Sequence, residues 1–217
     1  MTYKYIFWDW NGTLFDDAYP TYEAVNDMLE QRNIPQISFE RYRDTVEVPI
    51  INFYNSVMDM SKESMDDISR EFDRFWTEHL VSCPIFDHAK ELLDAISQKG
   101  IKQYIYSSSR SEKIIPYLEA FKLSAYFEQV IGATDCYVGS KAERTRSFIL
   151  ENAIDPKDIL FIGDMDHDSE VASIVGADCI LVECGHQSIK KLAPTGRKVI
   201  PSLNELKPIL LNSEVIK

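Results

Sequence analysis

Several features that define common protein classes are scarce or missing in this sequence of 217 residues. No apolar run approaches the roughly 20 residues that an α-helix needs to cross a bilayer, so we expect no membrane span. There are only four cysteines, and no two of them form a Cys-x-x-Cys motif. Cys179 and Cys184 lie close together but have no second pair nearby to complete a zinc site. Basic residues are the minority, with 23 Lys and Arg against 35 Asp and Glu and a formal net charge of −12. This charge opposes binding to nucleic acid or to an anionic membrane surface.

The first residues also lack the pattern of a secretory signal, because Asp9 follows the apolar stretch 5–8 too early. Together with cysteines that we expect to be reduced, this favours a cytoplasmic protein. Apolar residues are nevertheless plentiful: 45% of the chain is hydrophobic and 12% is aromatic. That content is enough for a packed core and excludes a mainly disordered chain.

After Pro84 the sequence alternates between strand and helix patterns. The predicted strands are 103–106, 129–131, 159–162 and 179–182, with a weaker one around Val199, and the predicted helices are 89–99, 112–121, 141–152, 168–175 and 203–211. A further buried strand, 5–8, opens the chain and must pair within the same sheet. Strand–helix units joined by short loops imply a parallel sheet covered on both faces. The expected fold class is therefore α/β, with a Rossmann-like parallel sheet as its core.

Between Tyr19 and about Leu80 the pattern is different, because apolar residues recur at helical spacing and strand signals are almost absent. We therefore expect an inserted all-helical domain of residues 17–81, which divides an α/β core domain of residues 1–16 and 82–217. The aromatic residues of the insert are expected in its own core: they are Phe53, Tyr54, Phe72, Phe75 and Trp76. Candidates for contact with a substrate are Tyr19, Tyr22, Arg43 and Glu47, among which the sequence does not choose.

Polar residues follow three of the predicted strands, at the edge where open parallel sheets bind ligands. They are Asp9-Trp10-Asn11-Gly12-Thr13 after the first strand, Ser107, Ser108 and Ser109 after the strand 103–106, and Gly163-Asp164 with Asp168 after the strand 159–162. Lys141 begins a helix at the same edge. Carboxylates can hold Mg²⁺, while a hydroxyl and a lysine can bind a phosphoryl group.

This set of motifs resembles that of the haloacid dehalogenase superfamily, a large group of aspartate-nucleophile phosphatases. Asp9-Trp10-Asn11-Gly12-Thr13-Leu14 is similar to the first family motif, Asp-x-Asp-Gly-Thr-Leu. Ser107, Lys141 and Gly163-Asp164 with Asp168 are similar to the second, third and fourth motifs. The resemblance covers nearly the whole chain, and a helical cap between the first two motifs is typical of the phosphoglycolate-phosphatase-like subfamily.

The resemblance implies a Mg²⁺-dependent phosphatase that acts on a small phosphorylated metabolite. Asp9 would attack phosphorus and form an aspartyl-phosphate, which splits one difficult step into two. The metal would be held by Asp9, Asp164 and the backbone carbonyl of Asn11, and it would offset the repulsion between carboxylate and phosphate. Asp168 would orient the water ligands of the metal. A monomer or homodimer with no nucleic-acid or membrane partner is expected.

The phosphoryl group would be bound by groups from the second and third motifs. Ser107 would donate a hydrogen bond to a phosphoryl oxygen, and Lys141 would supply positive charge. Ser108 and Ser109 are equally small and polar, so the register within the triplet is open, and Ser108 is the second substrate-binding candidate. In the first motif, Asn11 and Gly12 would also contact the substrate, because glycine allows the backbone to approach phosphate closely.

Asn11 departs from the family pattern, which places the general acid and base at this position. An amide forms hydrogen bonds, but it cannot give a proton to a leaving alkoxide or take one from water. General acid–base catalysis is worth about 10²–10⁴-fold in rate. Three outcomes are open: a slow phosphatase, a substrate with a good leaving group, or another residue that transfers the proton.

Alternative functions remain for this motif set. The chain could be an inactive relative that binds a phosphorylated ligand or partner, and Asn-Gly is also an ordinary turn pair. Phosphonoacetaldehyde hydrolases lack the same acid, but they need a cap lysine, and residues 18–83 contain only Lys62. Sugar-phosphate mutases are disfavoured because they depend on the missing acid. No metal ligand is expected among His79, His88, His167 and His186, and Arg110, Arg144 and Arg146 are expected to be solvated helix charges.

Overall fold

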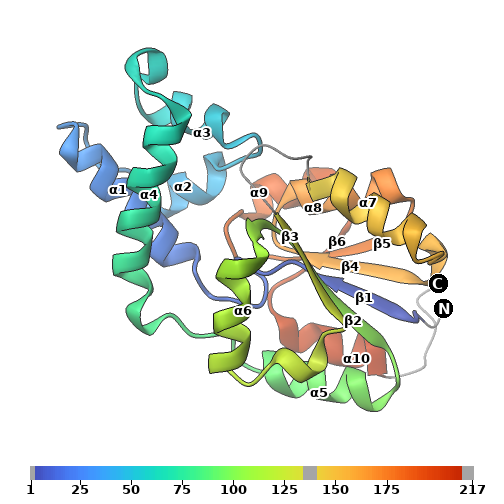
Figure 1. The fold of residues 1–217 in the computed structure, drawn as a ribbon. Helices are drawn as coiled ribbons and strands as arrows, with labels where there is room; N and C mark the ends of the chain where they lie inside the picture. Colours follow the sequence, from blue (N-terminus) through green and yellow to red (C-terminus); the bar gives the residue numbers. More distant parts are fainter. Residues whose placement is uncertain (1–2, 134–140, 212–217) are drawn as a thin grey trace.

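Six parallel strands form a single sheet in the computed structural model, which describes residues 3–133 and 141–211. The strand order is β3-β2-β1-β4-β5-β6 (Figure 1). The strands are β1 (Tyr5–Trp8), β2 (Lys102–Arg110), β3 (Gln129–Ala133), β4 (Ile159–Gly163), β5 (Asp178–Val182) and β6 (Lys198–Ile200). The expected α/β fold with a Rossmann-like parallel sheet is confirmed.

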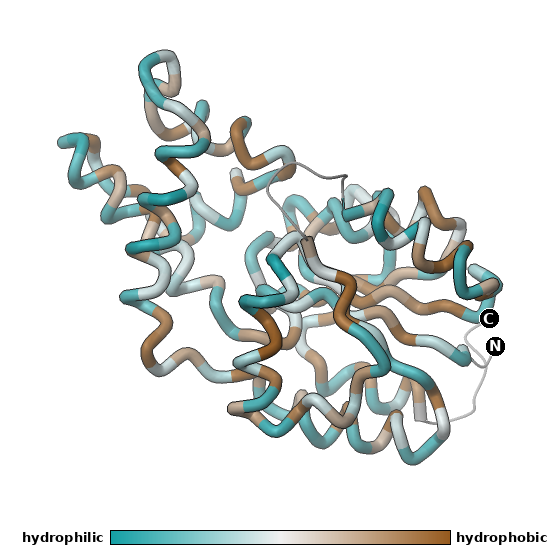
Figure 2. Tube along the Cα trace, in the orientation of Figure 1, coloured by the Kyte–Doolittle hydropathy of each residue, from teal (hydrophilic) through white to brown (hydrophobic). Residues whose placement is uncertain are grey.

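Helices cover both faces of this sheet, as the all-parallel arrangement requires. Ile6 and Trp8 pack with α5 (Ala89–Gln98), α6 (Ser111–Ala120) and α10 (Leu206–Leu211). Phe7 points to the opposite face and packs with α7 (Lys141–Glu151), α8 (Asp166–Val175) and α9 (Ile189–Leu192). Figure 2 shows how hydrophobic segments concentrate along the central strands.

The central strands β1 and β4 end at nearly the same level. Trp8 lies opposite Ile105 of β2 and Ile162 of β4, so the residues that follow β1 and β4 leave the sheet side by side. The chain proceeds from β1 outward through β2 and β3, and then returns to the other side of β1 at β4. This reversal makes the carboxyl end of β1 the topological switch point, where open sheets bind their ligands.

Helices between β1 and β2 form a separate layer beside the carboxyl edge of the sheet (Figure 1). This layer consists of α1 (Ala18–Gln31), α2 (Phe39–Thr45), α3 (Ile50–Val57) and α4 (Met65–His79), called the cap below, whereas α5, which also precedes β2, packs on the sheet. As expected, the five aromatic residues belong to the apolar cluster of the cap, with Phe53, Tyr54 and Phe75 buried. The division into a cap domain of residues 17–81 and a core domain of residues 1–16 and 82–217 stays a prediction.

Most element boundaries differ from the predicted ones by one or two residues, and three larger or more consequential differences stand out. β2 continues to Arg110, with a register shift after Tyr106, so the serine triplet lies inside the strand rather than after it. α8 begins at Asp166, because the Asp168 carboxylate accepts the backbone N–H of Met165 and caps the helix. The last helix is shorter than predicted and covers only Leu206–Leu211. None of the described helices is long and apolar enough to span a bilayer.

Candidate active site

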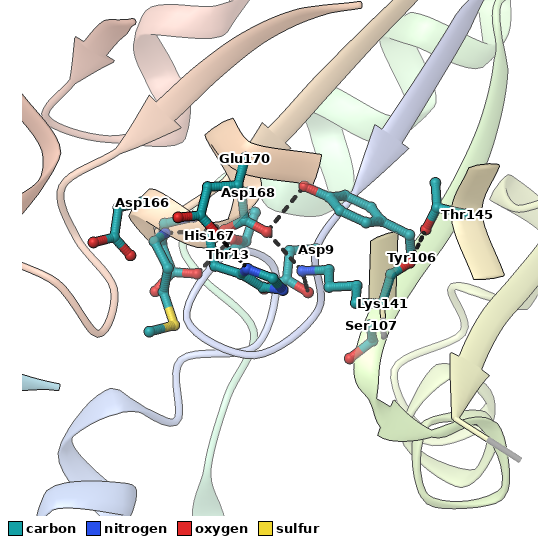
Figure 3. Close-up of polar contacts among 12 residues, drawn as sticks. Asp9, Thr13, Tyr106, Ser107, Lys141, Thr145, Asp166, His167, Asp168 and Glu170 are labelled. Atoms are coloured by element: carbon teal, nitrogen blue, oxygen red, sulfur yellow. Dashed lines mark hydrogen bonds and ion pairs between the residues drawn. The ribbon is translucent and has the colours of Figure 1, made fainter. Parts of the chain in front are cut away.

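Lys141 joins two carboxylates at the carboxyl end of β1 (Figure 3). Its Nζ lies 2.8 Å from Asp9 Oδ1 and 2.6 Å from Asp168 Oδ1, and all three residues are buried. Asp9 is fixed by its backbone N–H, which donates to Ile162 of β4 at 2.8 Å. Lys141 is the first residue of α7, so three separate segments meet at this ion pair.

Asp168 is the most strongly hydrogen-bonded of these carboxylates. Its Oδ1 also accepts the hydroxyl of Tyr106 at 3.0 Å, and its Oδ2 accepts the N–H groups of Asp164 and Met165. Burial alone would raise the pKa of Asp168, but Lys141 and these donors hold that pKa below its ordinary value. Asp168 is therefore an anion that orients Lys141 and the start of α8.

Asp164 approaches the same place from the end of β4. Its Oδ1 accepts the hydroxyl of Thr13 at 3.0 Å, and its Oδ2 accepts the backbone N–H of His186 at 2.6 Å. Gly12 packs directly against this carboxylate with a φ of +69°, and a Cβ at that position would overlap Asp164 Oδ2. Gly12 is thus required both by its left-handed backbone and by this close approach.

The carboxylate cluster, formed by Asp9, Asp164 and Asp168, has more negative charge than its surroundings neutralise. Each residue offers one oxygen, and these atoms all lie within 4.8 Å of one another. Burial raises the pKa of Asp9 to about 8 against the opposing effect of Lys141, and burial raises the pKa of Asp164 to about 6. One lysine does not neutralise three buried carboxylates, and an all-oxygen donor set suits a hard divalent cation. The residues therefore fit a metal such as Mg²⁺.

The serine triplet is split by the structure. Ser107 is buried, and its Oγ accepts the N–H of Ser109 at 3.0 Å. Ser108 is exposed, so the structure does not bring this candidate to the cluster. Arg144 donates to the carbonyl of Ser107 at 3.1 Å. The expectation that Arg144 is only a solvated helix charge is therefore wrong, because α7 packs beside the end of β2.

Asn11 is held between Asp17, which the sequence did not point to, and Ser109 of the serine triplet. Its Nδ2 donates to Asp17 Oδ2 at 2.7 Å, and its Oδ1 accepts the hydroxyl of Ser109 at 2.7 Å. Asp17 also accepts the N–H of Gly12 at 2.9 Å and is 1% exposed. A buried carboxylate thus lies one hydrogen bond away from the position where the family motif has its second aspartate.

His186 covers this turn from the loop that follows β5. Its Nε2 lies 3.4 Å from Asp17 Oδ1, and its Nδ1 lies 2.8 Å from the hydroxyl of Tyr42 in the cap. Burial disfavours the imidazolium, but the hydrogen bond and charge of Asp17, together with Asp164, raise the pKa of His186 to about 9. The rule that ligands gather beyond strand ends, applied also to β5, would have identified this residue.

The four cap candidates contact other residues of the protein, and their contact with a substrate stays a prediction. Arg43 donates to the carbonyls of Glu183 and Gln187, and Glu47 pairs with Lys191 at 2.9 Å, so both fasten the cap to the core. Tyr19 is exposed and packs on Tyr22. Lys62 is exposed in the short turn before α4, and within residues 3–133 and 141–211 it has no contact with the carboxylate cluster. The position of Lys62 gives no support to a Schiff-base role.

Comparison with known proteins agrees with this arrangement. Residues 6–182 match a family model described as haloacid dehalogenase-like hydrolase. A phosphoglycolate phosphatase of Shigella boydii is 26% identical over 155 residues, which cover 69% of this chain and 61% of the relative. Phosphoglycolate phosphatase 1 of Pseudomonas aeruginosa is 24% identical over 217 residues, covering 94% of this chain and 79% of the relative.

Solved structures show the same fold. A predicted phosphatase from Clostridium acetobutylicum superposes with a TM-score of 0.77 at 21% identity, covering 98% of this chain and 100% of that one. The similarity therefore includes the cap as well as the sheet.

Proposed function

Because the chain belongs to the haloacid dehalogenase-like hydrolase family, we propose that it hydrolyses a small phosphate monoester through Asp9. The observation that carries this proposal is the convergence of Asp9, Lys141 and the other carboxylates at the switch point of the sheet. The Asp9 carboxylate would attack phosphorus, and the bond between phosphorus and the ester oxygen would break. Water would then attack the aspartyl-phosphate, releasing inorganic phosphate and restoring Asp9.

Mg²⁺ is the cofactor that we propose for this reaction. Asp9, Asp164 and the carbonyl of Asn11 would hold the ion, and Asp168 would orient its water ligands. When bound, the ion neutralises negative charge on the substrate and on the carboxylates that surround it. Support comes from the raised pKa values of Asp9 and Asp164, because a cation beside them would favour the ionised form that attacks phosphorus.

Ser107 and Lys141 would hold the phosphoryl oxygens. The Oγ of Ser107 already accepts an N–H, so its own proton remains to be donated to the substrate. Lys141 stays charged, because Asp168 and Asp9 raise its pKa although burial lowers it. Gly12 would leave space for the phosphoryl group to approach the backbone, but its N–H already donates to Asp17 rather than to the substrate. The phosphate would therefore meet one cation and one hydroxyl on the side away from the metal.

Asp17 is the residue that we propose for proton transfer in place of Asn11. Asn11 has no proton to exchange, but its amide connects to the Asp17 carboxylate at 2.7 Å, and His186 lies on the other side of that carboxylate. A proton held by this pair could reach the leaving oxygen directly or through one water. This arrangement corresponds to the third of the outcomes expected for Asn11. A substrate with a good leaving group would need less of this help.

A second candidate function is favoured by Asn11 itself. A chain without the usual acid could bind a phosphorylated ligand or partner without turnover. The two functions differ in the effect of Asp9→Asn, which removes the nucleophile but keeps the shape of the site. Under hydrolysis the variant loses all phosphate release; under binding alone there is no release to lose, and ligand affinity is kept.

The test is phosphate release from a panel that includes acetyl phosphate, measured for the purified protein with Mg²⁺ and again with a chelator. We expect release that depends on the metal and that Asp9→Asn abolishes. Lys113→Met serves as a control, because Lys113 pairs with Asp73 at the surface. Absence of release from every substrate, with phosphate affinity intact, would contradict hydrolysis and support the binding function.

A further inference from the structure

A cavity of about 270 Å³ lies inside the cap, between α1, α3 and α4. Its lining residues are Thr21, Val25, Tyr42, Ile50, Phe53, Tyr54, Met65, Ser69, Phe72 and Asp73. Binding pockets for organic ligands have volumes from about 300 Å³ upward, so this cavity suits a single ring or a short chain.

Two of the lining residues also contact side chains beside the turn that follows β1. The hydroxyl of Thr21 lies 3.5 Å from Asp17 Oδ2, and the hydroxyl of Tyr42 lies 2.8 Å from His186 Nδ1. Met165, which directly follows Asp164, packs against the same apolar cluster of the cap. One further side chain, Asp17 or His186, therefore lies between each of these lining residues and the turn that carries Asn11 and Gly12.

The chemistry of the lining is unusual for a site that would receive a small acid. Five of the ten side chains are apolar and carry no hydroxyl, and none of the ten is Lys, Arg or His. The one charged group is Asp73, which is neutralised by Lys113 of α6 at 2.6 Å. A substrate carboxylate placed here would lose its hydration and find no cation, which is costly. Phosphoglycolate, which gives two relatives their names, carries such a carboxylate.

We propose that this cavity receives the organic group of the substrate, and that this group is uncharged and apolar. The substrate class is then a phosphate monoester of a small apolar alcohol or phenol, with an aryl phosphate favoured. A phenol has a pKa of about 10, as in tyrosine. It therefore leaves with less protonation than an alkoxide, which suits a site with Asn11 at the position of the acid. This inference rests on the proposed function, because it assumes that phosphorus binds at Asp9.

Binding of phosphonates tests the inference without turnover, because the carbon–phosphorus bond is not hydrolysed. Titration calorimetry with Mg²⁺ would compare benzylphosphonate with 3-phosphonopropionate, whose size and carboxylate imitate phosphoglycolate. We expect benzylphosphonate to bind at least about tenfold more tightly. Along a series of n-alkylphosphonates, each added methylene should lower the Kd about fourfold until the cavity is filled. Equal or tighter binding of 3-phosphonopropionate would overturn the proposal.

A matched pair of variants tests whether the preference for benzylphosphonate arises in the cavity. Ile50 lines the cavity and is 41% exposed, whereas Ile115 on α6 is 44% exposed and lies outside it, so lysine can be tolerated at both positions. Ile50→Lys should weaken benzylphosphonate binding about tenfold and strengthen 3-phosphonopropionate binding. Ile115→Lys should change neither. The same shift in both variants, or none in Ile50→Lys, would also overturn the proposal.

Hydrolysis measured in parallel separates this proposal from the proposed function. Release of phosphate from acetyl phosphate without any preference for phenyl phosphate or benzylphosphonate would leave the phosphatase function intact and refute the cavity assignment. Tight and selective benzylphosphonate binding without release from any ester would support the cavity assignment and refute the phosphatase function.

Discussion

Replacing Lys141 by methionine removes the cation at the centre of the site while keeping a side chain of similar length. Lys141 is almost completely buried, and its Nζ contacts both Asp9 and Asp168. Its ammonium also lies 4.1 Å from the centre of the Tyr106 ring. Without it, the three carboxylates of the cluster lose the one ion-pair partner that they have among the described residues, and the fold must bury their charge or protonate them.

The expected cost follows from the burial of these groups. Removing one partner of a buried ion pair lowers the free energy of unfolding by about 3–5 kcal/mol. For a chain of this size, about 2–4 °C of melting temperature corresponds to each kcal/mol, so we expect a decrease of about 6–20 °C. Activity should fall by about 10²–10³-fold, the range found when one transition-state donor is removed.

Differential scanning calorimetry with and without Mg²⁺ measures this effect. Lys4→Met is the control, because Lys4 pairs with Asp158 at the exposed surface, where such pairs contribute about 0–1 kcal/mol. Mg²⁺ should raise the melting temperature of Lys141→Met more than that of the wild type, because the cluster then attracts the ion without competition. A decrease no larger than that of Lys4→Met, with activity retained, would refute the reasoning.

The remaining predictions concern the carboxylates and their neighbours. Asp9→Asn should abolish phosphate release and raise the melting temperature of the metal-free protein at pH 8. The melting temperature should rise because the variant removes a buried group whose pKa of about 8 reports an unfavourable charge. A lower melting temperature would contradict this. The folded-state pKa values of Asp9 and Asp164, about 8 and 6, lie above the ordinary 3.8. The free energy of unfolding of the metal-free protein should therefore decrease as pH rises from about 4 to about 8. Mg²⁺ should stabilise the protein more at pH 8 than at pH 5.5. A thermal shift by Mg²⁺ that does not depend on pH would argue against a metal at these carboxylates. The exchange variant Asn11→Asp with Asp17→Asn keeps their 2.7 Å contact and moves the carboxyl group to the family position, so turnover of alkyl phosphates should increase, by up to about 10²-fold. Asp17→Asn alone should slow alkyl esters more than acetyl phosphate, and equal effects on both would exclude a role in proton transfer.

Local periodicity was sufficient to predict the sheet and the residues at its switch point. The buried runs before Asp9 and Asp164 made both strands recognisable, and parallel strands bring their carboxyl ends to one edge. The register shift in β2 was not predictable, because serine is compatible with a strand or a loop, and the shift depends on pairing with β3.

The residues that the sequence did not reveal act over long distances or in a tight turn. His186 follows β5, where the rule about strand ends would have identified it, whereas Tyr42 reaches the site from the cap and has no local pattern. Asp17 is only six residues from Asn11, but their contact depends on how the chain turns after Gly12. The cavity that carries the inference on the substrate is likewise a product of the packing of the cap helices.

Chemical trapping of the covalent intermediate tests the central claim most directly. The protein would be mixed with acetyl phosphate and Mg²⁺, quenched in acid and reduced with borohydride, which converts an aspartyl-phosphate to homoserine, and the modified residue would be located by tandem mass spectrometry. The account predicts homoserine at position 9 in the wild type and at no position in Asp9→Asn. Turnover without modification of Asp9, or modification at another carboxylate, would contradict it.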